Sequence, residues 1–286
     1  PHGGARDLEA GVLRAVDAAH FGEDPLRALR AVQLAARFEL RVDPKTAALC
    51  RSMPLFELPA ERVLGEIEKL LLEARRPSLG LALMSEWGML PVLAPELVPL
   101  ADTPQDPQWH PEGDVWTHTL LAVDQATPLL AGLDRPRALA VMLATLAHDL
   151  GKPGTTQRID GRIRSLGHEE AGVPLAEALL ERWGVRSWHG YDVRGQVLGL
   201  VGNHLKPGQL YDDRERVSDG EGGKAGLMLQ PAESLLFHGN GQPVACEKGD
   251  ARIAVIRVQA EDVHRGTTGE FAGEPASAGW PETAAV

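Results

Sequence analysis

Apolar residues recur every three or four positions along most of the chain up to residue 204, which is the spacing of helices that bury one face. Asp24-Pro25 is a typical helix start, because Asp can cap and Pro suits the first turn. Strand-like alternation is scarce, so the pattern predicts a mostly α fold. Further helices are predicted at residues 59–72, 79–87, 115–126, 136–150, 169–183 and 193–204.

The breaks between these helices predict how the chain is organised. Residues 102–113 are rich in Pro, Asp and Gln and form the best internal boundary. Gly151 and Pro153 are expected to end the helix before them. From residue 214 onward helical periodicity fades, and 251–262 is the one remaining stretch expected to form a helix. The small, polar last dozen residues are expected to be disordered.

Composition narrows the class of protein. The 43% hydrophobic and 24% charged residues are typical of a soluble globular protein, which favours a cytoplasmic location. A net charge of -11 argues against indiscriminate coating of nucleic acid or membrane, without excluding a local basic patch. Cys50 and Cys246 have no metal-site spacing, and the longest apolar run, 138–147, is too short to span a bilayer. No leader is evident, and the start at Pro1 reads as the middle of a longer sequence.

Histidine and aspartate residues provide the strongest chemical signal. His148 and Asp149 are adjacent at the end of an apolar helix, where an imidazole nitrogen and a carboxylate oxygen can bind one divalent metal. Three further histidines lie on neighbouring predicted helices, and a bundle that joins them would suit metal-assisted hydrolysis of a phosphate ester. Each histidine alone is more often an ordinary hydrogen-bonded residue, which is our interpretation of His110, His189 and His238. The three added to the site are His118, His168 and His204.

The order of these residues resembles the HD phosphohydrolase superfamily, a helical bundle that binds one or two divalent metals. The resemblance implies that His118, His148 and Asp149 are core ligands, and that His168 and His204 complete a second metal position or contact phosphate. It also implies a closing aspartate on a later helix, for which Asp262 within 251–265 is the candidate. Mg, Mn, Ni or Co would be the metal. The catalytic group would be His148, Asp149 and Lys152, with Lys152 neutralising phosphate unless it is only a solvated helix-end lysine.

The segment that opens the first long helix carries a second candidate site. Asp24 and Arg27 share a helix face, and a carboxylate beside a guanidinium could match the hydrogen-bonding edge of a nucleotide base. Alone, this pair is ordinary capping and ion pairing. In context, the run 21–31 with Ala36-Arg37-Phe38 resembles the neck of class II tRNA nucleotidyltransferases and bacterial poly(A) polymerases. The elements at 61–71 and 88–97 resemble the neck and body that follow.

The resemblance implies roles for the neck residues. Glu23, Asp24 and Arg27 would select ATP and CTP, while Arg62 and Glu66 would hold the neck helices and orient Arg27. The domains expected are a remnant of the catalytic head, a helical neck and body, an HD bundle and a divergent tail. Their ranges are 1–20, 21–105, 106–213 and 214–286.

The resemblance implies part of an enzyme that adds or repairs the tRNA 3′ CCA end and carries an HD phosphohydrolase acting on phosphate ends or 2′,3′-cyclic phosphates. Expected partners are the tRNA 3′ end and, in a complete enzyme, ATP and CTP with head-bound Mg; no membrane partner is expected. Without a head, the chain alone is expected to transfer no nucleotide. Two alternatives stay open: a free-standing HD nucleotide phosphohydrolase, and a non-catalytic RNA-binding module with a structural HD site.

Overall fold

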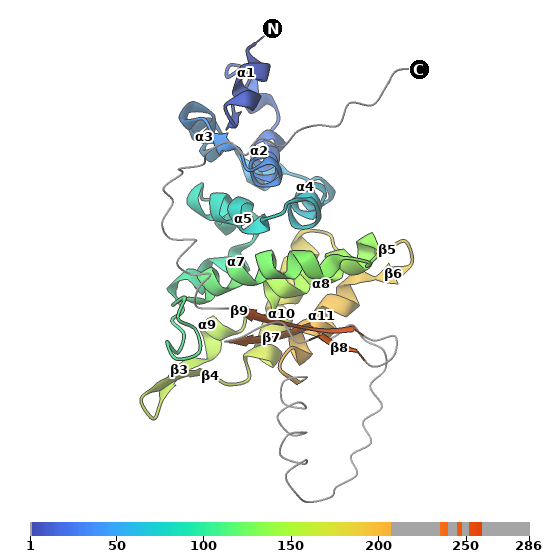
Figure 1. Cartoon of the computed structure of the whole chain (residues 1–286). Coiled ribbons are helices and arrows are strands. Elements are labelled where there is room, and N and C mark those ends of the chain that lie inside the picture. The colour runs from blue at the N-terminus through green and yellow to red at the C-terminus, as the bar shows by residue number, and fades with distance from the viewer. Residues whose placement is uncertain (1, 207–234, 240–244, 248–251, 259–286) are drawn as a thin grey trace, which may run out of the picture.

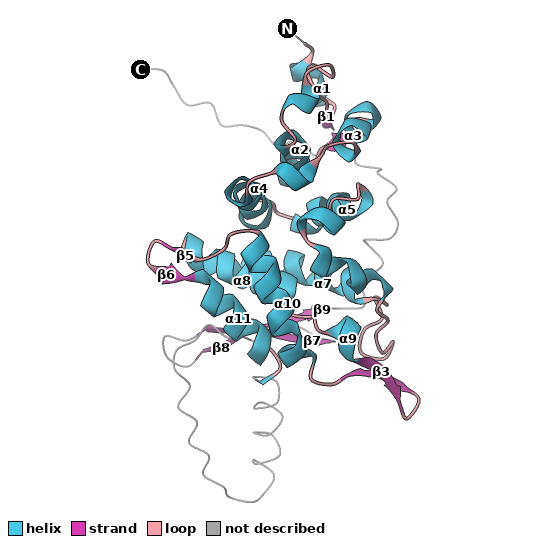
Figure 2. Ribbon diagram, turned by 180° about the vertical axis from the view of Figure 1, so that it is seen from behind, coloured by secondary structure: helices cyan, strands magenta, loops and turns pink. Residues whose placement is uncertain are grey.

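The computed structural model describes residues 2–206, 235–239, 245–247 and 252–258. Its described part is mainly helical, and the helices lie in two tiers with the N-terminal elements above helices α7 to α11 (Figure 1). Seen from behind, short strand pairs project at the periphery of the lower tier (Figure 2). The mostly α fold predicted from the periodicity is confirmed. No helix among the described residues is long and apolar enough to cross a membrane.

The upper tier is built on α2 (Leu26–Phe38), α4 (Ala60–Glu73) and α5 (Pro77–Glu86), which pack against one another. Gly80 lies at the closest approach, because an added Cβ would lie 2.4 Å from a methyl of Leu70. The other elements of this tier are α1 (Gly4–Glu9), β1 (Val12–Leu13), η1 (Phe21–Glu23), β2 (Arg41–Val42), α3 (Pro44–Arg51), η2 (Leu55–Glu57) and α6 (Leu90–Leu93), after which η3 (Pro95–Asp102) packs against the lower helices. β1 and β2 pair in parallel.

The lower tier is centred on α8 (Arg135–Ala147), in which every residue from Ala138 to Ala147 is buried. It packs against α7 (Val115–Ala126), α11 (Val193–Asn203) and α4 of the upper tier. Asp114 caps α7 and Asp134 caps α8 by accepting hydrogen bonds from backbone amides. Around them lie η4 (Thr127–Leu130), α9 (Lys152–Thr155), β3 (Thr156–Ile159), β4 (Arg162–Ser165), α10 (His168–Arg182), β5 (Ser187–Trp188) and β6 (Tyr191–Asp192).

Buried contacts join the two tiers. The fully buried Trp183, which follows α10, donates its indole N–H to the carbonyl of Leu93 at 2.7 Å. The Asp124 carboxylate of α7 accepts hydrogen bonds from the backbone amide and the hydroxyl of Ser78 at the start of α5, at 2.9 and 2.6 Å. A single buried hydrophobic cluster contains residues of both tiers, from Phe21 to Val201. The tiers are therefore held in a fixed relation by a shared core.

Two sequence predictions differ from the structure. The helix predicted at 136–150 ends at Ala147, and Gly151 instead precedes the short helix α9. The helix predicted at 251–262 is wrong where the chain is described: β9 (Arg252–Val258) pairs with β7 (Leu235–Gly239) and β8 (Ala245–Glu247). Four of its seven residues are Ile or Val, whose branched side chains favour strands.

The sequence prediction also missed the hairpin β3–β4, which pairs Thr156 with Ser165 and Ile159 with Arg162. Its turn is Asp160-Gly161, and both residues have positive φ, at 51° and 77°. That dipeptide is the preferred loop of a tight hairpin, so the signal was present in the sequence. Asp262, the residues expected to be a disordered end, and the rest of the predicted closing helix lie outside the described residues.

Candidate metal centre

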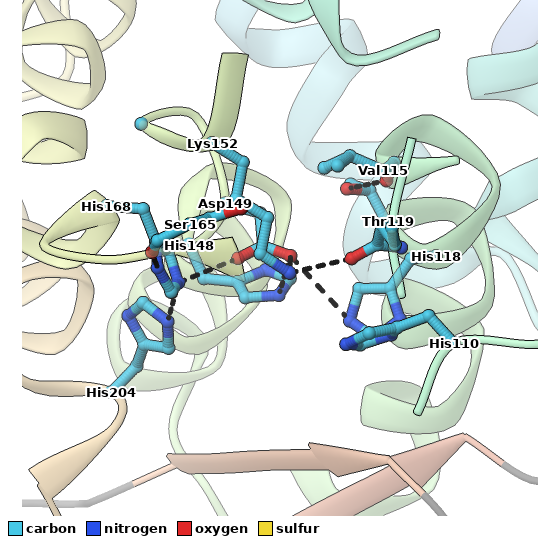
Figure 3. Close-up of polar contacts among 12 residues, drawn as sticks. His110, Val115, His118, Thr119, His148, Asp149, Lys152, Ser165, His168 and His204 are labelled. Atoms are coloured by element: carbon cyan, nitrogen blue, oxygen red, sulfur yellow. Dashed lines mark hydrogen bonds and ion pairs between the residues drawn. The ribbon is translucent and has the colours of Figure 1, made fainter. Parts of the chain in front are cut away.

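Four helices of the lower tier bring their chemically active side chains to one place (Figure 3). His118 comes from the first half of α7, and His148 and Asp149 follow directly after α8. His168 opens α10, and His204 follows the last residue of α11. The side chains of all five are buried. The structure therefore brings together every metal ligand predicted from the sequence except Asp262, which is not described.

Asp149 lies in the middle of this group. Its Oδ2 is 3.1 Å from His148 Nε2 and 3.8 Å from His118 Nε2, while its Oδ1 is 3.2 Å from His168 Nε2. His204 Nε2 lies 3.1 Å from His168 Nε2. Potential ligand atoms of His118, His148 and Asp149 lie within 4.8 Å of one another, as do those of Asp149, His168 and His204. One carboxylate thus bridges two groups of nitrogen ligands.

A hydrogen bond at Nδ1 orients each of the four imidazoles. Nδ1 of His118 lies 2.7 Å from Glu112 Oε1, and Nδ1 of His148 lies 2.8 Å from the Thr145 carbonyl oxygen. The Nδ1 atoms of His168 and His204 lie 2.6 and 2.7 Å from the carbonyl oxygens three residues before them. A carbonyl or carboxylate oxygen beside Nδ1 keeps the proton there and leaves Nε2 as the metal-binding atom.

This orientation tests whether a metal fits. With Nδ1 protonated on both His168 and His204, two Nε2 lone pairs face each other at 3.1 Å. Two nitrogens bound to one ion at about 2.1 Å are separated by a similar distance, so a cation between them would convert a repulsive contact into a pair of bonds. The nitrogen and carboxylate donors suit a divalent transition metal. The residues present therefore fit the metal that the sequence predicted.

Burial and the neighbouring charges keep two of the histidines neutral and Asp149 ionised, the states in which these groups bind a metal. Burial lowers the pKa of His118 to about 4, despite its hydrogen bond to Glu112. Burial, together with the charge of His148, lowers the pKa of His204 to about 3. Burial alone would raise the pKa of Asp149, but the charges of His148 and Lys152 outweigh it and hold that pKa well below its usual range. At neutral pH these two imidazoles are neutral and the carboxylate is ionised, as metal binding requires.

Glu112 is a functional candidate that the sequence analysis missed. It is buried on the loop before α7, and its Oε1 lies 2.9 Å from His110 Nδ1 as well as 2.7 Å from His118 Nδ1. Burial acts to raise the pKa of Glu112, but the hydrogen bonds from His110 and His118 lower it to about 2. His110 is hydrogen-bonded, as expected, yet it lies beside the site, with its ring 4.8 Å from that of His118. A carboxylate that holds a ligating histidine is a frequent feature of metal sites.

Gly151 explains how α9 and α10 approach so closely. Its φ of -78° is open to any residue, so backbone freedom is not the reason for glycine here. A Cβ at this position would lie 2.0 Å from the His168 carbonyl oxygen and 2.6 Å from the Gly172 amide nitrogen. Any side chain would push α10 away. Gly151 therefore lets His168 come within reach of Asp149.

The centre forms the inner wall of a cavity of about 260 Å³. Lys152 also lines it, but its ammonium group is buried and contacts Asp149 Oδ2 at 2.8 Å and Gln105 Oε1 at 2.7 Å. It is therefore no solvated helix-end lysine. Gln105, which sequence reasoning gave no role, fixes the amine from the loop before α7. The carboxylate nearest the predicted metal is thus balanced by a cation of the protein itself.

The neck residues predicted to select nucleotides lie near one another but are largely exposed. Arg62 of α4 contacts Asp24 Oδ2 at 2.8 Å, and this hydrogen bond lowers the pKa of Asp24. Arg27 lies 3.9 Å from Glu23 and donates to the carbonyl oxygen of His20. Arg62 contacts Asp24, whereas the buried Glu66 accepts hydrogen bonds from Arg30 and Lys69. Neither contacts Arg27 in these bonds. The orienting partner found for Arg27 is thus the backbone before α2.

Comparisons with known proteins identify both regions. The family model described as "HD domain" matches residues 115–236, and the one described as "Probable RNA and SrmB- binding site of polymerase A" matches residues 39–100. A "Multifunctional CCA protein" of Cupriavidus metallidurans is 42% identical over 187 residues, covering 64% of this chain and 43% of that protein. The protein of the same name from Alkalilimnicola ehrlichii is 44% identical over 189 residues, with the same two coverages.

The chain spans less than half the length of these relatives. A solved structure, "The complex structure of CCA-adding enzyme with CTP", is 20% identical with a TM-score of 0.45, over 76% of this chain and 43% of that one. A likeness at that level does not bear on the site. The two family models and the sequence relatives agree with the resemblance seen in the motifs. The chain therefore resembles the multifunctional CCA proteins over the part of their length that it spans, and it matches the family models of an HD domain and of a polymerase A RNA-binding site.

Proposed function

We propose that the lower tier is a divalent-metal phosphohydrolase that acts on phosphate ends or 2′,3′-cyclic phosphates of RNA and nucleotides. The observation that carries the proposal is the convergence of four Nδ1-anchored histidines on the buried carboxylate of Asp149. In this proposal residues 106–213 are the HD domain, and residues 21–105 are the neck and body of a longer enzyme that adds or repairs the tRNA 3′ CCA end. The names of the sequence relatives support that context.

The protein groups have separable tasks in this mechanism. His118, His148, Asp149, His168 and His204 would hold the metal, which when bound supplies Lewis-acid activation of the phosphoryl group and of water. The imidazole-rich donor set favours Mn, Ni or Co over Mg. Lys152 balances the Asp149 charge and presents a cation to the cavity, where a phosphate oxygen of the substrate would enter. Glu112 holds the His118 ring in its binding orientation.

The direct test is to purify the chain without chelator, measure bound metals by elemental analysis, and assay hydrolysis of 2′,3′-cyclic AMP with and without added Mn, Ni, Co or Mg. We expect bound metal and hydrolysis that chelator abolishes and metal restores. The His148→Ala variant should lose both while keeping its helical circular dichroism. Wild-type protein with neither metal nor chelator-sensitive hydrolysis would make the HD site structural and favour an RNA-binding module.

A second proposal concerns the upper tier. We propose that Glu23, Asp24 and Arg27, with Arg62, select the incoming nucleotide in the longer enzyme. The supporting observation is the contact of Arg62 with Asp24 across α2 and α4, which fixes one carboxylate oxygen while the backbone amide of Leu26 holds the other at 3.1 Å. In an enzyme that includes a head domain, Arg27→Ala should change the preference among CTP, ATP, GTP and UTP by about 10- to 100-fold. Unchanged preferences would return Arg27 to a capping role.

A further inference from the structure

The lining of the cavity includes apolar side chains beside the polar metal-site residues. Trp109, Ile163 and Leu205 line the cavity together with the metal-site residues. Trp109 is 47% exposed, and no other tryptophan among the described residues is a largely exposed hydrophobic side chain. It immediately precedes His110, whose ring packs on that of His118. A solvent-accessible indole therefore lines the same cavity as the metal-site residues, and the next residue in the chain contacts the His118 ring.

The backbone of Trp109 is held firmly for a loop residue. Its amide donates to the Asp106 carbonyl at 3.0 Å, and the His110 amide donates to the same oxygen at 2.8 Å. The Asp106 side chain accepts from the Gln108 amide at 3.0 Å and from Arg162 Nε of strand β4 at 3.0 Å. These bonds tie the loop to the hairpin β3–β4. These bonds thus fix the backbone position from which the indole projects.

Nothing in the described fold requires an indole at this position. Trp109 is not part of the buried hydrophobic cluster, whereas Trp183 is fully buried and hydrogen-bonded within it. Within the described ranges, the Trp109 indole N–H donates no hydrogen bond and no ring stacks on the indole. Exposed aromatic rings beside a phosphate-binding site are well suited to stack on nucleobases, because every base offers a flat π surface.

We propose that Trp109 is a base-stacking platform, and that the preferred substrates are nucleoside phosphates whose base rests on the indole while the phosphate reaches the metal centre. This inference rests on the proposed phosphohydrolase function and adds the specificity-determining residue. Stacking is tolerant of base identity. Stacking therefore predicts that the enzyme prefers phosphate esters that carry a base over esters that do not. Its preference for purines over pyrimidines should be smaller.

The test compares wild type with Trp109→Ala and Trp109→Phe on two substrates, 2′,3′-cyclic AMP and the base-free ester glycerol 2-phosphate. In Trp109→Ala, KM for the cyclic nucleotide should rise by about 5- to 150-fold with kcat nearly unchanged. Hydrolysis of glycerol 2-phosphate and metal content should stay as in wild type. Trp109→Phe should recover most of the loss. Phe56→Ala is the matched control, because Phe56 is an exposed aromatic (74%) outside this cavity.

Each result bears on the inference separately from the proposed function. If Trp109→Ala impairs both substrates equally, or neither, the platform is overturned while the hydrolase stands. If wild type hydrolyses neither substrate, the proposed function fails, and calorimetric binding of 2′-AMP to the Mn-loaded protein then decides the platform. Equal affinity of wild type and Trp109→Ala in that titration would overturn it. A loss of affinity restored by Trp109→Phe would support it.

Discussion

Two clusters of carboxylates and basic side chains lie in opposite environments: the HD centre around Asp149 is buried, and the neck cluster around Asp24 is partly exposed. At the centre, the side chains of Asp149 and His118 are 1% and 4% exposed. In the neck, Asp24 and Arg62 are 29% and 43% exposed. Water solvates the neck charges, so pairing them costs little desolvation free energy. Their pairing is therefore weak evidence for a ligand site. Charged and polar groups that converge without solvent are costly unless something compensates them, so the buried cluster is the stronger indication of a ligand.

The largest effect should come from removing the carboxylate that bridges the two nitrogen groups. Asp149→Asn removes the negative charge from the middle of four histidines and Lys152, with almost no change in volume. Because metal activation is worth several kcal/mol, hydrolysis should fall about 1000-fold, with loss of bound metal. Steady-state kinetics and elemental analysis measure both.

The matched control is Asp124→Asn, which alters a largely buried carboxylate that does not line the cavity. Asp124 holds the start of α5 through Ser78, and burial raises its pKa. This variant should lose about 1 kcal/mol of unfolding free energy and keep full hydrolysis. If both variants retain activity, Asp149 is not a ligand. If both lose it equally, the loss reports general destabilisation.

The next effect is a steep acid dependence of the metal-free protein. In the folded protein burial lowers the pKa of His118 to about 4 and that of His204 to about 3, below the ordinary imidazole pKa of 6.5. The unfolded chain therefore binds more protons in this range. Stability should be fully present above pH 6.5 and should fall toward pH 4, by about 1.4 kcal/mol per pH unit for each histidine.

Urea unfolding of chelator-treated protein between pH 4.5 and 7.5 measures this slope. The His118→Gln variant should have a flatter profile, because one of the two titrating groups is gone. His20→Gln is the control, since His20 is exposed on the upper tier. A wild-type profile that is flat over this range would mean that the buried imidazoles do not hold their neutral form.

A smaller effect is expected from the carboxylate that orients His118. Glu112→Gln removes the charge beside His118 Nδ1 but keeps a hydrogen-bonding oxygen, so the fold should persist. Metal affinity should fall about 10- to 100-fold, the range typical of groups that orient a ligand. Competition with a metal-binding dye measures it. Glu96→Gln provides the control, because Glu96 is similarly shielded but pairs with Arg182 at 2.8 Å away from the centre. Unchanged affinity in Glu112→Gln would remove Glu112 from the site.

The helices and most of the candidate centre could be predicted because their signals are local. Asp24-Pro25 precedes α2, Gly88 with its positive φ follows α5, and both are visible in the sequence. The histidines fall at helix ends or on an inner helix face, so the bundle joins them without detailed knowledge of packing. The bulk of the metal site follows from that placement.

The parts that sequence did not predict depend on tertiary structure. Glu112 and Gln105 reach the centre from a loop whose path is set by long-range hydrogen bonds, including Gln105 to Lys152. Gly151 looked like a helix terminator, but its role is the close approach of α10. In β9, apolar spacing suited a helix, while its Ile and Val content favoured the strand that pairs with β7 and β8. The roles of Glu112, Gln105 and Gly151 are therefore not encoded in neighbouring residues alone, whereas the strand signal of β9 was present in the sequence.

The smallest effect should be found in the neck, where it measures the other half of the comparison. Arg62→Ala breaks the 2.8 Å contact with Asp24 between α4 and α2, yet both groups stay hydrated. The free energy of unfolding should therefore fall by only about 0.2–1 kcal/mol. A double-mutant cycle with Asp24→Asn, measured by urea unfolding at low and high salt, should give a coupling energy in the same range that shrinks as salt increases. A salt-independent coupling well above this range would show that the neck pair is shielded like the HD centre. A small, screened coupling would mean that folding does not require this pair, so any large effect of Arg62→Ala on nucleotide choice would report recognition rather than stability.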